Sequence, residues 1–311
     1  MNTHNKKIIL YFVTDLDYFV SHRLNLALAA NNDNYKIFVL TDISLINFKL
    51  KKLPINWVHF SFKKTSLNPI ILLYEYFKFL KILSKIKPDI IHSIAIRPSI
   101  ISGFSRLFKK KPSRIISFSG KGSGYLLKNL FIRQILNFLI KFSFDNSKVI
   151  VQNLSDLNFL SVLGLKKSNL ILIEGVGVDT DIFYPSKNKN NTPVVLFASR
   201  LLRDKGLLEF IAAAQALNLN GIFKIAGKFD LQNPSSLSTE FITDCHNKKI
   251  IRYLGYSKNM PLTLREADIL CLPSYSEGMP KVILEAMASG LAVIATDIPG
   301  CNDVIKNNYN G

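Results

Sequence analysis

The chain has 311 residues, 48% of them apolar, and a formal net charge of +18. This length and apolar content exclude a disordered chain and suit two domains of ordinary size, each with its own core. The three cysteines, Cys245, Cys271 and Cys301, are odd in number and lack metal-ligand spacing, which indicates a reduced cytoplasmic protein rather than a disulfide-stabilised secreted one.

The first apolar run does not predict a secretory leader. Residues 8–13 form a short run that Asp15 and Asp17 follow at once, whereas a signal peptide has a longer apolar region. The sequence also has no uncharged stretch of about 18 residues, the length that a membrane-spanning helix needs. We therefore expect a protein that works in the cytoplasm.

The positive charge lies in the first half of the chain. Residues 1–170 hold 26 Lys and Arg against 8 Asp and Glu, whereas residues 171–311 hold 14 of each kind. Such a surface favours an anionic partner: phospholipid, a lipid diphosphate or nucleic acid. A general bias toward lysine is the alternative, but it does not explain why the two halves differ.

The first elements predict the start of a parallel sheet. Residues 7–13 form an apolar strand, residues 21–30 begin a helix with Ser21 as its N-cap, and residues 35–40 form the next strand. Since strand-to-helix loops face the ligand in doubly wound sheets, His22 and Arg23 are expected near a ligand. A capping serine with an exposed His-Arg pair is the alternative.

Two later segments predict basic amphipathic helices. Residues 69–87 place Glu75 and three lysines on one charged stripe, and residues 127–144 are similarly basic and amphipathic. Either segment could lie in a membrane interface, and either could pack on the sheet with its lysines in water. For residues 127–144 we favour membrane contact, because they belong to the basic half.

Two more strand ends in the first half carry candidate residues. Residues 87–93 form a strand that delivers His92 to its end, with Arg97 in the loop beyond. A further strand ends in a loop with Gly120 and Gly122, where the backbone can approach a ligand closely and bind an anion. The alternatives are a structural histidine and a flexible turn.

A polar run at residues 186–191 is the best linker in the sequence, and it leads us to divide the chain into domains 1–170 and 171–311. The second domain opens with a strand at residues 194–198, followed by Arg200 and Lys205. Two cations at the carboxyl end of a strand suit a diphosphate, although such residues are often only solvated.

The most informative stretch follows the apolar strand at residues 269–272. A loop carrying Glu277 leads to Pro280, which predicts the first residue of a helix ending at Gly290, and Glu285 lies about a turn and a half into that helix. The free N–H groups at the start of the helix suit a phosphate. Two glutamates at this spacing also occur by chance on surfaces.

The Glu-x7-Glu element, with Glu-Gly-Met-Pro and Glu-Ala-Met-Ala inside it, resembles the donor-sugar motif of the retaining glycosyltransferases of family 4. The resemblance implies an α/β protein of the GT-B fold, in which two Rossmann-like domains face each other across a cleft. It implies that Glu277 contacts hydroxyls of the transferred sugar and that Glu285 binds the ribose. Arg200 and Lys205 would neutralise the leaving diphosphate.

The resemblance covers nearly the whole chain. It departs at Ser199, where glycine is usual, at Ile94, where many relatives have a second histidine, and at Ser119, where some have one. It implies a donor-binding set and an acceptor-side set, the first of Gly120, Gly122, Gly278, Met279 and Pro280 with Glu285, and the second of His22, Arg23, His92 and Arg97.

The implied function is retaining transfer of a hexose or N-acetylhexosamine from a nucleotide-sugar, with UDP as the expected nucleotide, to a lipid-linked or polysaccharide acceptor. Such enzymes build bacterial O-antigens and capsules. We expect no metal, the Asp15-Leu-Asp17 pair being only a weak candidate site, no other cofactor and no nucleic-acid partner. The basic half would hold the enzyme peripherally on the inner face of the cell membrane.

Relatives continue beyond Gly311, so we expect a second domain that is truncated at its carboxyl end. This leaves one alternative open, an inactive remnant that binds only membrane or nucleotide. An epimerase on the same double-Rossmann plan would need proton-transfer residues that the sequence does not place. A nucleic-acid binder would need a recognisable module of aromatic and basic residues.

Overall fold

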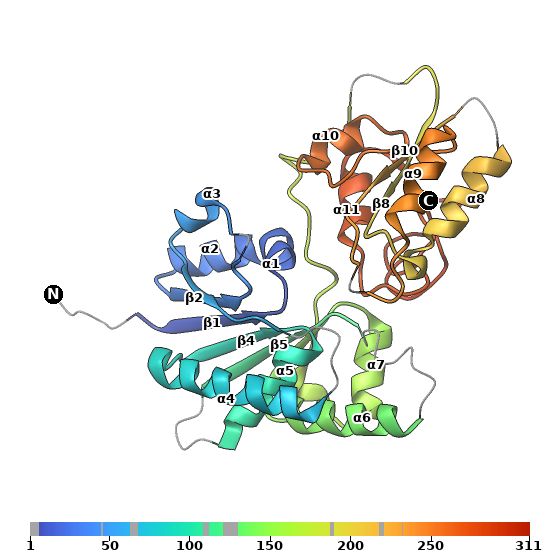
Figure 1. Cartoon of the computed structure of the whole chain (residues 1–311). Helices are drawn as coiled ribbons and strands as arrows, with labels where there is room; N and C mark the ends of the chain where they lie inside the picture. Colours follow the sequence, from blue (N-terminus) through green and yellow to red (C-terminus); the bar gives the residue numbers. More distant parts are fainter. Residues whose placement is uncertain are drawn as a thin grey trace. The chain divides into compact units, whose positions relative to one another are not determined.

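The computed structural model describes residues 6–44, 46–62, 68–107, 112–120, 130–186, 190–217, 221–231 and 233–311. The chain divides into two compact units, Met1–Ile173 and Glu174–Gly311, called unit 1 and unit 2 below. Each unit is built around its own parallel β-sheet with helices packed on it (Figure 1).

Unit 1 has a seven-stranded sheet in the order β3-β2-β1-β4-β5-β6-β7. Its strands are β1 (Ile8–Val13), β2 (Lys36–Thr41), β3 (Asn56–His59), β4 (Ile90–Ile94), β5 (Ser113–Phe118), β6 (Lys148–Val151) and β7 (Leu170–Leu172). Its helices are α1 (Leu16–His22), α2 (Leu24–Asn32), α3 (Phe48–Lys51), α4 (Pro69–Ile86), α5 (Ile96–Gly103), α6 (Leu130–Phe144) and α7 (Leu154–Val162). The strand order reverses between β1 and β4, as in a doubly wound Rossmann sheet.

Unit 2 has a five-stranded sheet in the order β10-β9-β8-β11-β12. Its strands are β8 (Val194–Ala198), β9 (Ile222–Ala226), β10 (Arg252–Tyr253), β11 (Ile269–Leu272) and β12 (Ala292–Ala295). Its helices are α8 (Leu207–Leu217), α9 (Thr239–Asn247), α10 (Met260–Arg265) and α11 (Lys281–Ala288), and a single 3-10 turn, η4 (Arg203–Lys205), precedes α8. The reversal point here lies between β8 and β11.

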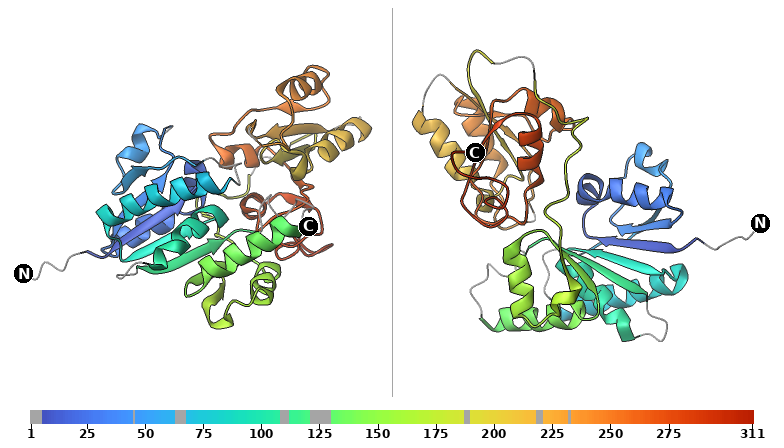
Figure 2. Two further views of the ribbon diagram at one scale, coloured as in Figure 1. Left: turned by 60° about the horizontal axis from the view of Figure 1, so that its bottom comes forward. Right: turned by 180° about the vertical axis from the view of Figure 1, so that it is seen from behind.

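Alternation along β1 explains how the sheet of unit 1 is covered. Leu10 and Phe12 point to one face, where Phe12 stacks on Phe79 of α4 with ring centroids 4.8 Å apart. Tyr11 and Val13 point to the other face and pack with residues of α1 and α2. Figures 1 and 2 show the same arrangement, with α4, α5 and α6 on one side of the sheet and α1 and α2 on the other.

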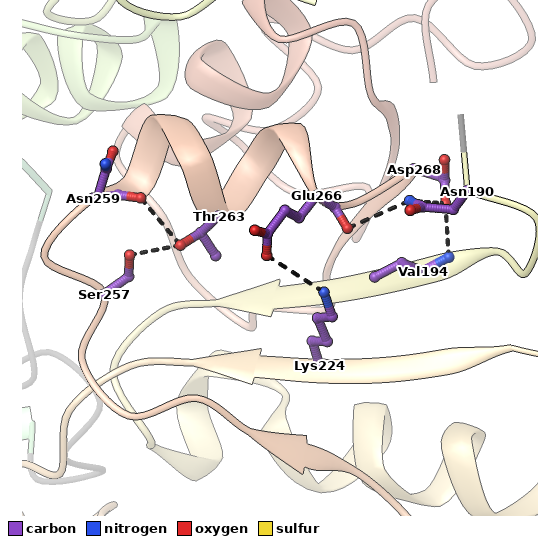
Figure 3. Close-up of polar contacts among 8 residues, drawn as sticks. All are labelled: Asn190, Val194, Lys224, Ser257, Asn259, Thr263, Glu266 and Asp268. Atoms are coloured by element: carbon purple, nitrogen blue, oxygen red, sulfur yellow. Dashed lines mark hydrogen bonds and ion pairs between the residues drawn. The ribbon is translucent and has the colours of Figure 1, made fainter. Parts of the chain in front are cut away.

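An aspartate fixes the amino edge of each sheet. In unit 1, Asp89 accepts a hydrogen bond from the backbone N–H of Ile8 at 2.8 Å, and in unit 2 Asp268 accepts one from the backbone N–H of Val194 at 2.8 Å. Asp268 also accepts from the Asn190 side chain at 2.9 Å (Figure 3). Each aspartate thereby accepts a hydrogen bond from the first N–H of the neighbouring strand.

The first helix differs from its prediction. It begins after Asp15, whose carboxylate accepts from the N–H of Tyr18 at 3.1 Å, and Ser21 lies inside it rather than at an N-cap. The Ser21 hydroxyl donates back to the Asp17 carbonyl at 2.7 Å, a bond that serine makes within helices. Prediction of Pro280 as the first helical residue was also wrong, because Pro280 is the N-cap of α11.

Among the helices that the structure describes, none combines the length and the apolar character needed to cross a bilayer.

Candidate functional site

The candidate residues of unit 2 gather at the carboxyl edge of its sheet. β8 and β11 are neighbours in the centre of the sheet, and both are parallel, so the loops that follow them emerge side by side. The loop after β8 carries Arg200 and leads into η4, which contains Lys205; the loop after β11 carries Glu277 and leads into α11. Ligands of open α/β sheets bind at such a reversal point.

Lys205 and Glu277 form an ion pair at the centre of this edge. The Lys205 Nζ lies 2.7 Å from Glu277 Oε1 and 3.4 Å from the carbonyl of Ser276. The two side chains are only 14% and 13% exposed, so water screens the pair less than it would a surface pair. The pair brings one fixed cation and one fixed carboxylate to the same place.

Hydrogen bonds hold the two loops together. The N–H of Tyr275 donates to the carbonyl of Asp204 at 3.0 Å, and the Ser274 hydroxyl donates to the same carbonyl at 3.3 Å. Gly206 has a φ of +72°, and a Cβ at this position would lie 2.0 Å from the Pro273 carbonyl oxygen. Only glycine therefore permits this approach, and any side chain at Gly206 would push the loops apart.

Gly300 is a residue of the site that the sequence did not single out. A Cβ on it would lie 2.2 Å from the carbonyl oxygen of Gly278, and its φ is +90°. The loop after β12 therefore rests directly on the backbone beside Glu277. The Pro299-Gly300 pair is a turn signal, but only the fold shows which backbone it meets.

The start of α11 adds a second polar feature. Pro280 caps the helix without a side-chain hydrogen bond, so the first backbone N–H groups of α11 have no side-chain cap. Met279 is buried and packs where Gly175 leaves room, since a Cβ there would lie 2.6 Å from its sulfur. The helix dipole and free N–H groups make this end suited to an anion.

Glu285 lies in α11 and is 9% exposed. Its carboxylate is 2.8 Å from the Nζ of Lys281, one helical turn earlier. Lys281 also lies 5.9 Å from the centre of the Phe183 ring. Lys281 was not among the residues predicted from the sequence, and it holds the Glu285 carboxylate in place.

Arg200 has a separate partner, Asp230, at 2.9 Å. Both side chains are well exposed, 50% and 34%, so the pair is weak and its guanidinium can turn toward a ligand at little cost.

Two thiols of unit 2, the buried Cys301 and the half-buried Cys271, are poorly suited to act as nucleophiles. Burial raises the pKa of Cys301 to about 12, with a smaller contribution from the nearby Glu277 carboxylate. Burial also raises the pKa of Cys271 to about 11. Both thiols are therefore protonated at neutral pH, and Cys301 serves as packing beneath the Lys205–Glu277 pair.

In unit 1, His92 lies within β4 and is buried. Its Nε2 is 2.8 Å from the Ser117 hydroxyl, and its ring lies 5.2 Å from that of Tyr11. Burial, with a smaller contribution from the Arg23 charge, lowers its pKa to about 3. His92 is therefore neutral at physiological pH. Burial likewise raises the pKa of Tyr11 to about 12.

Arg97 lies in α5 and binds the Glu75 carboxylate with two hydrogen bonds, at 2.9 and 3.1 Å. The side chains are 13% and 3% exposed. The prediction that Glu75 shares one charged stripe with three lysines is wrong for Glu75, because its carboxylate is turned inward to this guanidinium.

His22 and Arg23 lie where α1 meets α2. His22 stacks on Tyr18 with ring centroids 4.1 Å apart. Arg23 is 7% exposed; one of its terminal nitrogens donates to the His22 carbonyl at 3.1 Å, while its buried Nε has no hydrogen-bond partner in the part of the chain that the structure describes. A buried guanidinium nitrogen without a partner is costly, which makes Arg23 a candidate for contact with an anion.

The glycine loop is described only in part. Gly120 has a φ of +92°, and a Cβ added to it would meet none of the described residues within 4 Å. Gly122 lies outside the described residues.

Two family models match the chain, one for each half. "Glycosyl transferase 4-like" matches residues 8–153, and "Glycosyl transferases group 1" matches residues 179–311. Together they cover most of both units.

Among curated proteins, the chain is 31% identical over 306 residues to the N,N'-diacetylbacillosaminyl-diphospho-undecaprenol alpha-1,3-N-acetylgalactosaminyltransferase of Campylobacter jejuni, covering 93% of this chain and 80% of that one. It is 34% identical to the UDP-Gal:alpha-D-GlcNAc-diphosphoundecaprenol alpha-1,3-galactosyltransferase of Escherichia coli, covering 43% of this chain and 38% of that one.

Among solved structures, Anabaena HepE in complex with UDP and glucose is similar with a TM-score of 0.74 and 15% identity, covering 98% of this chain and 84% of that one. At this identity the likeness concerns the fold. It agrees with the two Rossmann-like units described above, and the fold class is GT-B.

Proposed function

Because this chain belongs to the family of group 1 and 4-like glycosyltransferases, we propose that it transfers a hexose or N-acetylhexosamine from a UDP-sugar to a lipid-linked acceptor during assembly of a surface glycan. The observation that carries the donor part of the proposal is the cluster at the carboxyl edge of unit 2. There the Lys205–Glu277 pair and the start of α11 lie at the ends of adjacent strands.

Each component of this cluster has a counterpart in a UDP-sugar. Lys205, Arg200 and the N–H groups at the start of α11 offer positive potential to a diphosphate. Glu277 offers a carboxylate to sugar hydroxyls, and Glu285 offers one to the ribose. The HepE structures of this fold hold UDP with glucose and UDP-glucose, which supports a nucleotide-sugar of this class.

The proposed reaction proceeds with retention and without a metal. The bond between the anomeric carbon and the β-phosphate oxygen breaks, and the acceptor oxygen bonds to the same face of the sugar. The acceptor proton passes to the departing phosphate. Negative charge grows on UDP as the bond breaks, so Lys205 and Arg200 stabilise the transition state more than the bound donor.

Two of the relatives named above act, by their names, on sugars joined to undecaprenol through a diphosphate. We propose the same class of acceptor here. Unit 1 supports it with the buried Arg23, whose Nε lacks a partner in the described chain, and with His22 beside it. We assign these two residues to the acceptor side.

The test is a transfer assay with UDP-hexoses and UDP-N-acetylhexosamines, using a sugar-diphospho-undecaprenol acceptor. Lys205→Ala should lower kcat by roughly 100- to 1000-fold, the loss typical of one transition-state donor. Lys248→Ala is the matched control, because it removes the lysine of an equally short but exposed pair, 2.8 Å from Asp244. It should leave kcat unchanged.

One result of these measurements would contradict the proposal. If the folded chain binds UDP but transfers no sugar from any of these donors, the protein is a non-catalytic nucleotide binder and the proposal is wrong.

A further inference from the structure

Two helices of unit 1 expose rows of large apolar side chains. On α4 the row is Ile70, Leu73, Tyr74 and Phe77, at helical spacings of three and four, and these side chains are 55–74% exposed. Residues that recur at this spacing lie on one face of a helix. The row therefore forms a continuous stripe on the outer side of α4.

Helix α6 repeats the arrangement. Phe131, Ile135 and Phe138, at spacings of four and three, are 70%, 44% and 65% exposed, and Leu130 beside them is 71% exposed. Ile140 and Phe144 are instead buried in the core of unit 1. The helix thus has two apolar faces, one against the sheet and one in solvent. Packing in the core of unit 1 explains the apolar face against the sheet, but it does not explain the apolar face in solvent.

A chain of aromatic rings joins the two stripes. The exposed ring of Phe77 lies 5.7 Å from Tyr76, which lies 5.8 Å from Phe104. Phe104 lies 5.1 Å from Phe142, which lies 6.2 Å from the exposed ring of Phe138. The α4 and α6 stripes, with these connecting rings, are called the α4/α6 face below.

The figures place this face on one side of unit 1. Figure 1 shows α4 and α6 below the sheet with α5 in between, and in the left view of Figure 2, where that side comes forward, both helices are turned toward the viewer. Contiguous apolar patches of this kind mark interaction surfaces.

The charges at the carboxyl ends of the stripes are all positive. On α4 the stripe continues into Lys81 and Lys85, and on α6 into Lys141, each of them exposed. Within these two helices the sole carboxylate is Glu75, which is buried against Arg97. The face therefore combines apolar rows with cations and presents no exposed carboxylate of its own helices.

Elsewhere among the described residues, exposed apolar side chains do not form such rows. Val162 at the end of α7 is 86% exposed and Leu231 in unit 2 is 71% exposed, but each lies outside any stripe of this kind. A single exposed apolar residue needs no explanation, whereas eight on two neighbouring helices do.

We propose that the α4/α6 face docks on an anionic lipid bilayer. Amphipathic helices that lie in a membrane interface place aromatic and aliphatic side chains among the acyl chains and lysines at the headgroups. The lysines complement anionic headgroups, and the excess of basic residues in residues 1–170 adds to that attraction. Docking requires neither a donor nor an acceptor, so it goes beyond the proposed reaction.

The experiment measures co-sedimentation of the full chain with vesicles, in the absence of any sugar nucleotide or acceptor. Wild type should bind phosphatidylglycerol vesicles, bind phosphatidylcholine vesicles far more weakly, and lose affinity as salt is raised. The Phe77→Ser/Phe138→Ser double variant should lose roughly tenfold or more of its affinity for the anionic vesicles, because two rings that would enter the bilayer are removed.

Two further variants separate the contributions. Lys81→Glu/Lys141→Glu should weaken binding to phosphatidylglycerol without changing binding to phosphatidylcholine. Val162→Ser/Leu231→Ser, which removes equally exposed side chains outside the face, should bind as wild type does. Circular dichroism melts identify any variant that fails to fold.

Three results would overturn the proposal. One is wild-type protein that stays in the supernatant with anionic vesicles, and another is equal losses in the α4/α6 and control variants. The third is a concentration-dependent dimer, seen by light scattering without lipid, that the Phe77→Ser/Phe138→Ser variant abolishes while lipid binding is absent. Because the assay contains no substrates, these outcomes are independent of catalytic activity.

Discussion

Units 1 and 2 are alike at one edge of their sheets and different at the other. At the amino edge, Asp89 and Asp268 occupy equivalent places and accept the same backbone hydrogen bond, each at 2.8 Å, from the strand beside them. In both units this edge is closed by bonds within the unit. The repeated device stabilises a sheet and involves no ligand.

The candidate residues are held differently in the two units. In unit 1, His92 is buried against Ser117, and Arg97 is bound twice by a buried carboxylate. In unit 2, the Lys205–Glu277 pair, whose side chains are 14% and 13% exposed, lies where two strands end, and Glu285 lies in the helix that follows one of them. An ion pair at such a strand end can exchange a partner for a ligand, whereas loss of Arg97 would leave the Glu75 carboxylate, 3% exposed, without compensation.

The largest expected loss of stability comes from replacing Arg97. Arg97→Met should lower the free energy of unfolding by about 3–5 kcal/mol, because it leaves the Glu75 carboxylate buried without its guanidinium. Urea unfolding measures the loss, and Glu75→Gln/Arg97→Met should recover much of it. A variant of unchanged stability whose KM for the acceptor rises would instead give Arg97 a direct role at the acceptor.

His92 makes the stability of unit 1 depend on pH. Because its pKa is about 3 in the folded chain and 6.5 ordinarily, the unfolded state takes up a proton first as the pH falls. From pH 7 to pH 5 this should cost about 2 kcal/mol of stability, and the cost continues to grow down to pH 3. His92→Gln should remove this part of the pH dependence. An unchanged slope of stability against pH would mean that His92 is not buried neutral.

The smallest expected losses of stability come from replacing the aspartates at the two amino edges, and they allow the two units to be compared directly. Asp89→Ala should destabilise unit 1, and Asp268→Ala unit 2, each by about 1.5 kcal/mol, because a hydrogen bond to a charged group is lost. Calorimetric unfolding should show a lower midpoint for one unit in each variant. Loss of transfer activity per folded molecule in either variant would break the analogy between the two edges.

The sequence predicted the order of strands and helices well, because parallel strands buried on both faces read as continuous apolar runs, as in residues 8–13 and 269–272. It failed at Ser21 because a serine before an apolar helix resembles a cap, and the true cap, Asp15, lies six residues earlier. Local patterns compete at helix starts, and the packing of the finished sheet decides between them.

In the candidate site too, some features could be predicted from the sequence and others could not. The motif placed Glu277, Lys205 and Glu285 by residue type and spacing, and their roles stay predictions. The spacing did not predict that Lys205 pairs with Glu277, that Lys281 holds Glu285, or that Gly300 rests on Gly278, since these contacts join separate loops or depend on side-chain conformation.

The central claim is that the carboxyl edge of unit 2 binds the nucleotide part of the donor. The most direct measurement is calorimetric titration of the chain with UDP, beside Lys205→Ala and Glu285→Ala, with His22→Ala in unit 1 as the control. We predict that both unit 2 variants lose about 1–3 kcal/mol of binding free energy and that the control binds UDP as wild type does. Unchanged UDP affinity in both unit 2 variants, or no binding of UDP, GDP or ADP to the folded wild-type chain, would contradict the claim.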